Sequence, residues 1–159
     1  MIAFVLCAIA LAFQSTAQSA TGMSGMQYYV GNWSCMGGQP KKAPVRATIS
    51  YAMDGGLMRE WIVAPAQKGM KTPYYESVAT TYDAKHNRYV EAGMDNTGGW
   101  GVTYVTLSGD TETGVDHATA DGKLGHSITH RVNNTTFTFT GYPTLTSTIA
   151  NFQATCHRS

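Results

Sequence analysis

The sequence has few charged residues and no strong excess of either sign. Asp, Glu, Lys and Arg make up 13% of the 159 residues, and the formal net charge is +1 at pH 7. Charges that are this few and this evenly balanced provide neither a basic field for nucleic acid nor an acidic tail. The small basic group Lys41, Lys42 and Arg46 lies in a proline-containing stretch and is interpreted as a solvated loop. We therefore predict no nucleic-acid partner.

Long hydrophobic runs are also scarce. Residues 2–13 form one apolar run, which has the length of a signal-peptide core and is too short for a bilayer span. The small residues that precede Ala17 predict a signal peptide of residues 1–17, with Ala20 as the alternative end. No later run could span a membrane, so we expect a secreted or periplasmic protein. Residues 21–159 have a length that suits a single domain.

Cysteine is rare. The chain has three cysteines, and Cys7 falls inside the predicted signal peptide, which leaves Cys35 and Cys156. An even number of cysteines in an oxidising compartment predicts one disulfide. Two buried free thiols are the alternative. A bond between these cysteines would join the first predicted strand to the last, as closure of a sheet into a barrel requires.

Leucine is scarce as well, whereas residues that favour strands are common. After residue 17 there are four leucines but twenty threonines, with many valines and tyrosines. Turn signals recur about every ten residues, which is typical of an antiparallel sandwich or barrel. The fold class we predict is all-β, an antiparallel up-and-down β-barrel of about 8–10 strands. The strands are expected near residues 32–37, 45–53, 57–64, 74–83, 88–94, 100–107, 112–120, 124–132, 135–140 and 148–157.

Alternation along the strands predicts which side chains face the barrel interior. Phe137 and Phe139 alternate with threonines, so the odd positions of this strand are expected to face inward. If residues 133–134 form a two-residue turn, the even positions of 124–132 face inward as well, His126 and His130 among them.

A second turn predicts a histidine pair. The Asp-Gly sequence at residues 121–122 favours a two-residue hairpin, which would place His117 directly opposite His126 inside the barrel. Continuing through the preceding hairpin places Trp100 and Tyr104 on the inner face.

The orientation of Glu60 depends on the turn that follows Met53. A two-residue turn directs Glu60 inward, whereas a three-residue turn directs Arg59 and Trp61 inward instead, and both remain open. The candidate ligand-binding residues are therefore His117, His126, Tyr104, Trp100, Glu60 and His130.

The start of the first predicted strand carries a family resemblance. Gly31-x-Trp33 resembles the opening of lipocalin and calycin barrels, in which an arginine packs on the tryptophan, and Arg158 stands just past the last strand for that role. Together with the paired cysteines, further short patterns make the chain similar to small secreted bacterial lipocalin-like proteins of unknown function. These patterns are Tyr51-x-Met53-Asp54-Gly55, Tyr82-Asp83, Asn87-Arg88-Tyr89 and Gly98-Gly99-Trp100. The resemblance implies a lipocalin-like barrel.

Three functions are consistent with these features. The first is a barrel that binds a small apolar or amphipathic molecule. The second is a metal-binding protein or enzyme that uses His117 and His126, for which Glu60 could supply a third ligand. The third is a structural module with a filled barrel. No catalytic residue is predicted, because the chain lacks a nucleophile elbow and a phosphate-binding loop. No metal or cofactor is assigned either. Its oligomeric state stays open.

Overall fold

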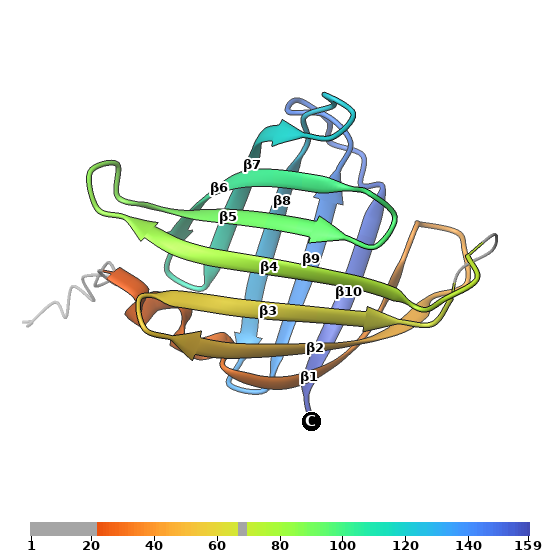
Figure 1. Ribbon diagram of the computed structural model, residues 1–159, viewed down its shortest axis with the longest axis horizontal. Coiled ribbons are helices and arrows are strands. Elements are labelled where there is room, and N and C mark those ends of the chain that lie inside the picture. The colour runs from red at the N-terminus through yellow and green to blue at the C-terminus, as the bar shows by residue number, and fades with distance from the viewer. Residues whose placement is uncertain (1–21, 67–69) are drawn as a thin grey trace, which may run out of the picture.

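The computed structural model describes residues 22–66 and 70–159 (Figure 1). The predicted signal peptide lies outside these residues. A 3-10 helix, η1 (Gly22–Tyr29), precedes the first strand. Ten strands follow in this part of the chain, close to the predicted ranges. They are β1 (Gly31–Gly38), β2 (Val45–Asp54), β3 (Leu57–Ala64), β4 (Tyr74–Asp83), β5 (Arg88–Asp95), β6 (Trp100–Ser108), β7 (Thr111–Thr119), β8 (His126–Asn133), β9 (Thr136–Tyr142) and β10 (Phe152–Arg158).

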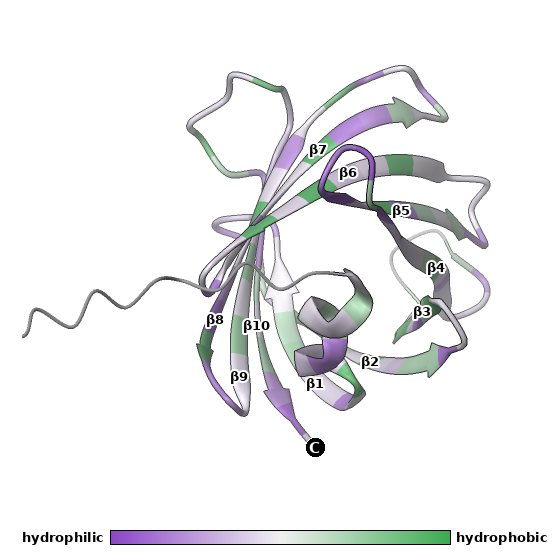
Figure 2. Ribbon diagram, turned by 90° about the vertical axis from the view of Figure 1, so that its left-hand side faces the viewer, coloured by the Kyte–Doolittle hydropathy of each residue, from purple (hydrophilic) through white to green (hydrophobic). Residues whose placement is uncertain are grey.

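The strands form one closed barrel. Each strand pairs antiparallel with its neighbours in sequence, and β1 pairs with β10 to complete the ring. In Figure 1, β2 to β6 run across the direction of β8 to β10 behind them. Figure 2 shows η1 at one end of the ring of strands. The predicted all-β up-and-down barrel is therefore confirmed.

The two ends of the barrel differ. The end that holds η1 and the β2–β3, β4–β5, β6–β7 and β8–β9 turns is called the closed end here. Met26 and Tyr29 of η1 belong to the buried core there, with exposed fractions of 1% and 4%. The longer β7–β8 and β9–β10 connections lie at the other end, the open end. An up-and-down topology dictates this alternation, because each strand reverses the direction of the last.

Trp33 is the centre of the closed-end core. It is 0% exposed, its ring centroid lies 4.8 Å from that of Phe137, and its indole N–H donates to the Tyr29 carbonyl at 2.7 Å. The Arg158 guanidinium lies 4.4 Å from the Trp33 ring centroid. Gly31 has a φ of 125°, and a Cβ there would lie 2.9 Å from the Arg158 guanidinium. The three residues named by the resemblance thus meet in one contact.

The disulfide joins the first strand to the last. Cys35 and Cys156 are directly opposite in the β1–β10 register and are bonded. Both are buried, with exposed fractions of 3% and 1%. The predicted pairing is confirmed, and the alternative of two free thiols is wrong.

A β-bulge at Val132 changes which face of β8 points inward. Asn133 pairs with Thr136 and Arg131 pairs with Phe137, so the turn comprises residues 134–135 rather than 133–134. Phe137 faces inward as predicted, and Arg131 shares its face. Val132 is 52% exposed. The predicted inward set of β8 is wrong because the unpaired residue reverses the alternation.

The β7–β8 connection separates the predicted histidine pair, because it spans residues 120–125 instead of forming a two-residue turn at residues 121–122. His117 is the extra residue between Asp116 and Ala118, which pair with successive residues of β6. Across β7 and β8, His126 lies opposite Val115 instead of His117. The prediction of facing histidines is therefore wrong.

Candidate ligand cavity

The barrel encloses a cavity of about 820 Å³. It extends from Met26 and Tyr29 at the closed end to Trp100 and Phe152 at the open end. This volume lies within the range of roughly 300–1,000 Å³ that small-molecule sites occupy. The closed end alone is filled by core side chains, so the rest of the interior can accept a ligand.

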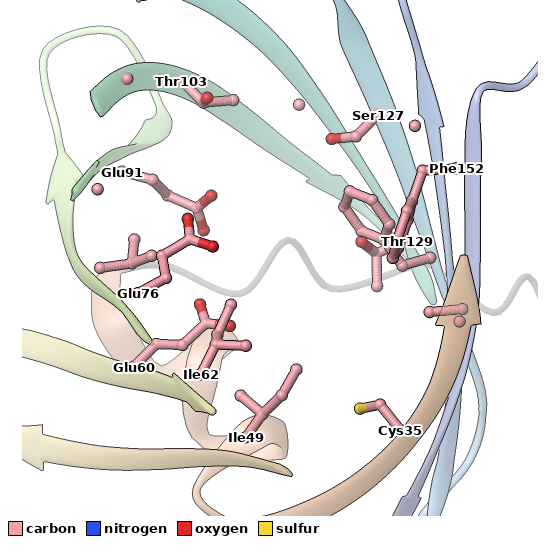
Figure 3. Close-up of a pocket in the computed structure, with 18 of the residues that line it drawn as sticks. Cys35, Ile49, Glu60, Ile62, Glu76, Glu91, Thr103, Ser127, Thr129 and Phe152 are labelled. Atoms are coloured by element: carbon pink, nitrogen blue, oxygen red, sulfur yellow. The ribbon is translucent and has the colours of Figure 1, made fainter. Parts of the chain in front are cut away.

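One side of the cavity is apolar. Ile49 and Ile62 are opposite each other in the β2–β3 register and line the cavity beside the glutamates, where Ile62 also pairs with Glu76 across β3 and β4 (Figure 3). Phe139 and Phe152 come from β9 and β10, with 6.0 Å between ring centroids. Phe152 lies across the cavity from the glutamates in Figure 3. These side chains suit the apolar part of a small molecule.

The other side is acidic. The chain has four glutamates, and all of them line the cavity: Glu60 on β3, Glu76 on β4, Glu91 on β5 and Glu112 on β7. Figure 3 shows the first three carboxylates on neighbouring strands, all pointing into the cavity. Glu60 faces inward because Asp54 pairs with Leu57 across a two-residue turn. The structure thereby decides between the two turns that the sequence left open.

Three of these glutamates have neutral neighbours. The Tyr74 hydroxyl donates to Glu76 Oε2 at 2.8 Å, and the Thr80 hydroxyl donates to Glu91 Oε1 at 3.5 Å. Glu60 faces Tyr51 across the β2–β3 pair. Such hydroxyls satisfy a carboxyl oxygen without neutralising a negative charge.

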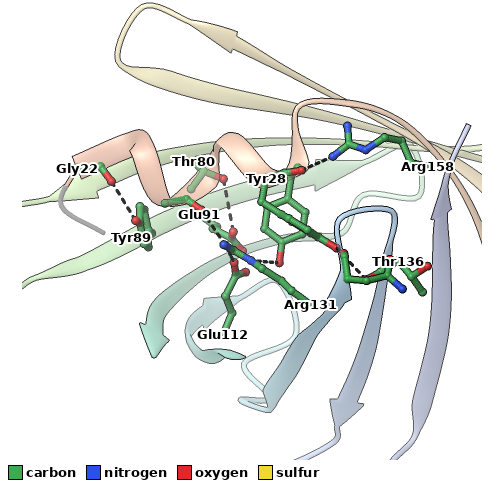
Figure 4. A network of polar contacts seen from close by, with 12 residues as sticks. Gly22, Tyr28, Thr80, Tyr89, Glu91, Glu112, Arg131, Thr136 and Arg158 are labelled. Carbon is green, nitrogen blue, oxygen red and sulfur yellow. Dashed lines mark hydrogen bonds and ion pairs between the residues drawn. The ribbon is translucent and has the colours of Figure 1, made fainter. Parts of the chain in front are cut away.

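The fourth glutamate is paired with a cation. Arg131 forms an ion pair with Glu112, and their side chains are only 11% and 9% exposed. Figure 4 shows Arg131 beside Glu112, and Arg131 also donates to the Gly25 carbonyl at 2.8 Å. The Tyr89 hydroxyl donates to the Gly22 carbonyl at 3.0 Å, so both ends of η1 are attached to the barrel. The Arg131–Glu112 ion pair therefore helps to hold η1 against the closed end of the barrel.

Burial controls the ionisation of the acidic side. It raises the pKa of Glu60 to about 8, the negative charge of Glu91 adds to this effect, and a hydrogen bond from Tyr51 opposes it. Burial likewise raises the pKa of Glu91 to about 7, together with the charge of Glu112. It also raises the pKa of Glu76. Without a ligand, the carboxyl groups of Glu60 and Glu91 are therefore partly protonated at neutral pH.

These shifts predict that the empty protein loses stability as the pH rises. Unfolded glutamates lose their protons near pH 4.5, whereas folded Glu91 and Glu60 keep theirs up to about pH 7 and 8. The folded state binds more protons over this window, so the free energy of unfolding falls between pH 5 and 8. We expect a loss of about 3 kcal/mol, reduced from the full linkage value because the cavity admits water.

Urea denaturation at pH 5 and pH 8 measures this effect. In the double variant Glu60→Gln/Glu91→Gln, the free energy of unfolding should depend much less on pH than in the wild type. Asp110→Asn removes an exposed carboxylate from the β6–β7 turn and should keep the wild-type dependence of stability on pH. A wild-type protein that is equally stable at both pH values would contradict the assigned shifts.

Three of the residues singled out from the sequence lie at the cavity. Glu60 is in its wall, and Trp100 lines the open end with an exposed fraction of 52%. The His126 ring stacks on Tyr142 with 4.3 Å between ring centroids, and its Nδ1 lies 2.9 Å from the Thr144 carbonyl oxygen. His126 is thus a rim residue that borders the β9–β10 connection.

The other three candidates lie outside the cavity, which corrects the prediction. Tyr104 stacks on His117 with 4.5 Å between ring centroids, and the Arg88 guanidinium lies 3.5 Å from the Tyr104 ring centroid. His130 is exposed, with its Nδ1 3.3 Å from the Thr111 hydroxyl. The bulge at Val132 causes these errors, because it reverses the inward face assigned to β8 and to the strands before it.

The described residues contain neither a metal-binding cluster nor a membrane-spanning helix. Within residues 22–66 and 70–159, no three His, Cys, Asp or Glu side chains are grouped so that they could hold a metal ion. No helix of the same residues has the length and hydropathy that crossing a bilayer requires.

Comparison with known proteins supports the architecture. No family model matches the chain, and no curated protein matches it. Among solved structures, the crystal structure of Rv2717c from M. tuberculosis is similar, with a TM-score of 0.60 and 12% sequence identity. The match covers 86% of this chain and 96% of that one. At 12% identity, this similarity shows the barrel architecture alone.

Proposed function

We propose that this protein is a secreted or periplasmic lipocalin-like barrel that binds a small apolar or amphipathic molecule in its interior. The observation that carries the proposal is the cavity of about 820 Å³, which is open at one end and lined by apolar side chains with a few polar groups. Small-molecule sites have this composition, and small barrels hold one such ligand.

The closed end supports the lipocalin-like part of the proposal. The packing of Arg158 on Trp33 beside Gly31 reproduces the arrangement that the resemblance implies. The Cys35–Cys156 disulfide is compatible with an oxidising compartment, where such bonds persist.

The two alternative functions have less support. A metal site built on His117 and His126 needs both side chains at one place, and the first lies on the outer wall beside Tyr104. A barrel with a purely structural role is expected to be filled by layers of side chains along its length. Here the filled part is the core around Trp33 at the closed end.

A cavity-blocking substitution tests the proposed function. Ile62→Trp places a large ring in the cavity, whereas Val63→Trp places it on the outer wall, where Val63 is 38% exposed. A neutral apolar probe, N-phenyl-1-naphthylamine, should fluoresce when it binds the wild type. We expect Ile62→Trp to weaken this binding at least tenfold and Val63→Trp to leave it unchanged.

Thermal melts establish that both variants are folded before binding is compared. Equal binding by the two folded variants would show that the probe binds elsewhere. No binding to the wild type would contradict a ligand cavity. Native mass spectrometry of the purified protein adds an independent readout, since a retained organic mass should appear in the wild type and be absent from Ile62→Trp.

A further inference from the structure

We propose that the molecule held in the cavity is an organic cation, a protonated amine with an apolar body, whose ammonium group binds among Glu60, Glu76 and Glu91. This inference rests on the proposed binding function and specifies the class of ligand. Two independent features carry it: the barrel cavity with its apolar surface, and the absence of any Lys or Arg among the described residues that line the cavity beside Glu60, Glu76 and Glu91.

The three carboxylates lie on three successive strands of the inner face. Val78 on β4 lies opposite Glu60 on β3, and Glu76 is two residues before Val78 on the same strand. Glu91 on β5 lies opposite Thr80, two residues after Val78. Glu60 and Glu76 are diagonal neighbours, whose Cα atoms lie about 7–8 Å apart, within reach of long side chains, and Glu91 extends into the cavity from the next strand, β5. Figure 3 shows the three side chains converging on the cavity.

Gly93 leaves room between these carboxylates. It lies opposite Val78 on β5, in the position between Glu91 and Asp95 on the inner face. A Cβ at Gly93 would lie 3.2 Å from a Val78 methyl and 3.5 Å from Glu76 Oε1. The absence of a side chain therefore keeps open the space that an ammonium group would enter.

The other acids of the cavity have strong donors of their own. Glu112 is paired with Arg131. Asp95 accepts from the backbone N–H groups of Thr97 and Gly99 at 2.7 and 3.0 Å. Asp116 accepts from the Gly125 backbone N–H at 2.9 Å.

Among the described residues, the hydrogen-bond partners of Glu60, Glu76 and Glu91 are hydroxyl groups, and the cavity lining includes no Lys or Arg. A primary ammonium group has three N–H donors and one positive charge, which complements these acceptors.

The apolar side determines the rest of the ligand. Ile49, Ile62 and Phe139 line the cavity together with the glutamates. A small inorganic cation would leave this surface without a partner. An alkyl or aryl amine would cover it while its ammonium group meets the carboxylates. A carboxylate ligand would place a like charge beside the glutamates, which opposes binding at any pH where both are ionised.

Proton release follows from this arrangement. Burial and mutual repulsion keep Glu60 and Glu91 partly protonated when the cavity is empty. An ammonium group favours their ionised forms and lowers their pKa. Binding of the amine at neutral pH should therefore release protons, whereas a neutral ligand of the same length should release none.

A matched series of ten-carbon ligands tests the inference by isothermal titration calorimetry at pH 7. The probes are decylamine, decanol and decanoate, each used below its micellar concentration. We expect decylamine to bind at least tenfold more tightly than decanol, and decanoate to bind least. The heat of decylamine binding should also vary with the ionisation enthalpy of the buffer, which reports the released protons.

Glutamine variants assign the effect to the glutamates. Glu60→Gln, Glu76→Gln and Glu91→Gln should each weaken decylamine binding about tenfold and leave decanol binding unchanged. Asp110→Asn, which removes an exposed carboxylate that is not among the described cavity-lining residues, should change neither. Equal weakening of both ligands by the Gln variants would mean that the glutamates only support the fold, and would overturn the inference.

The series separates this inference from the proposed function. If decanol or decanoate binds as tightly as decylamine, the cavity binds ligands but does not select cations. If none of the three ligands binds the folded wild type, the proposed function fails and the inference fails with it.

Discussion

Replacing both Cys35 and Cys156 by alanine is expected to lower the free energy of unfolding by about 5 kcal/mol. The bond spans a sequence separation of 121 residues, and a crosslink that closes so long a loop restricts the unfolded chain strongly. It is also the covalent link between β1 and β10, the pair that closes the barrel. Urea denaturation of the oxidised wild type and the double variant measures the difference.

Neighbouring positions on the same strands provide the control for this experiment. Met36 and Thr155 are paired on β1 and β10 and point away from the cavity. The variant Thr155→Ala keeps the disulfide and should change the stability by less than about 1 kcal/mol. A loss below about 1 kcal/mol in the double cysteine variant would show that closure does not depend on the crosslink.

Trp33→Ala is expected to cost about 3–5 kcal/mol, as removal of a large aromatic from a core does. Trp33 is 0% exposed and contacts Phe137 edge-on. Its loss would also leave the Tyr29 carbonyl without its indole donor and remove the ring beneath Arg158. Because Tyr29 belongs to η1, the helix should detach more readily from the closed end.

Trp61 is the matched control, since it is 55% exposed on the outer face of β3. Trp61→Ala should cost less than about 1 kcal/mol. Hydrogen exchange provides a second readout, because the backbone amides of η1 should lose protection in Trp33→Ala and keep it in Trp61→Ala. Equal stability losses for the two variants would contradict the assignment of Trp33 as the centre of the core.

Local patterns in the sequence predict much of the barrel. The recurring turn signals locate the strands, and the two cysteines left after the predicted signal peptide identify the crosslink. Gly31 and Trp33 mark the start of the first strand, and Arg158 the end of the last. The alternation of Phe137 with threonines gives the correct face of β9. All of these signals act within a few residues or concern residues with few possible partners.

The acidic side of the cavity was largely missed from the sequence. Only Glu60 was singled out, although every glutamate of the chain lines the cavity. Alternation rules assign polar side chains to the solvent face, so an inward glutamate looks like a surface residue. The signal that could have revealed the group is its position, since Glu76 and Glu91 lie within predicted strands, away from the turns.

The sequence by itself determined the strands, the closure and the crosslink, because these depend on local turn chemistry and on a single cysteine pair. The tertiary structure alone decided the contents of the interior. One unpaired residue at Val132 reverses the alternation, moving Arg131 inward and leaving His117 beside Tyr104 outside. A bulge depends on how a strand pairs with partners elsewhere in the chain. Its own residues therefore carry little local signal of it.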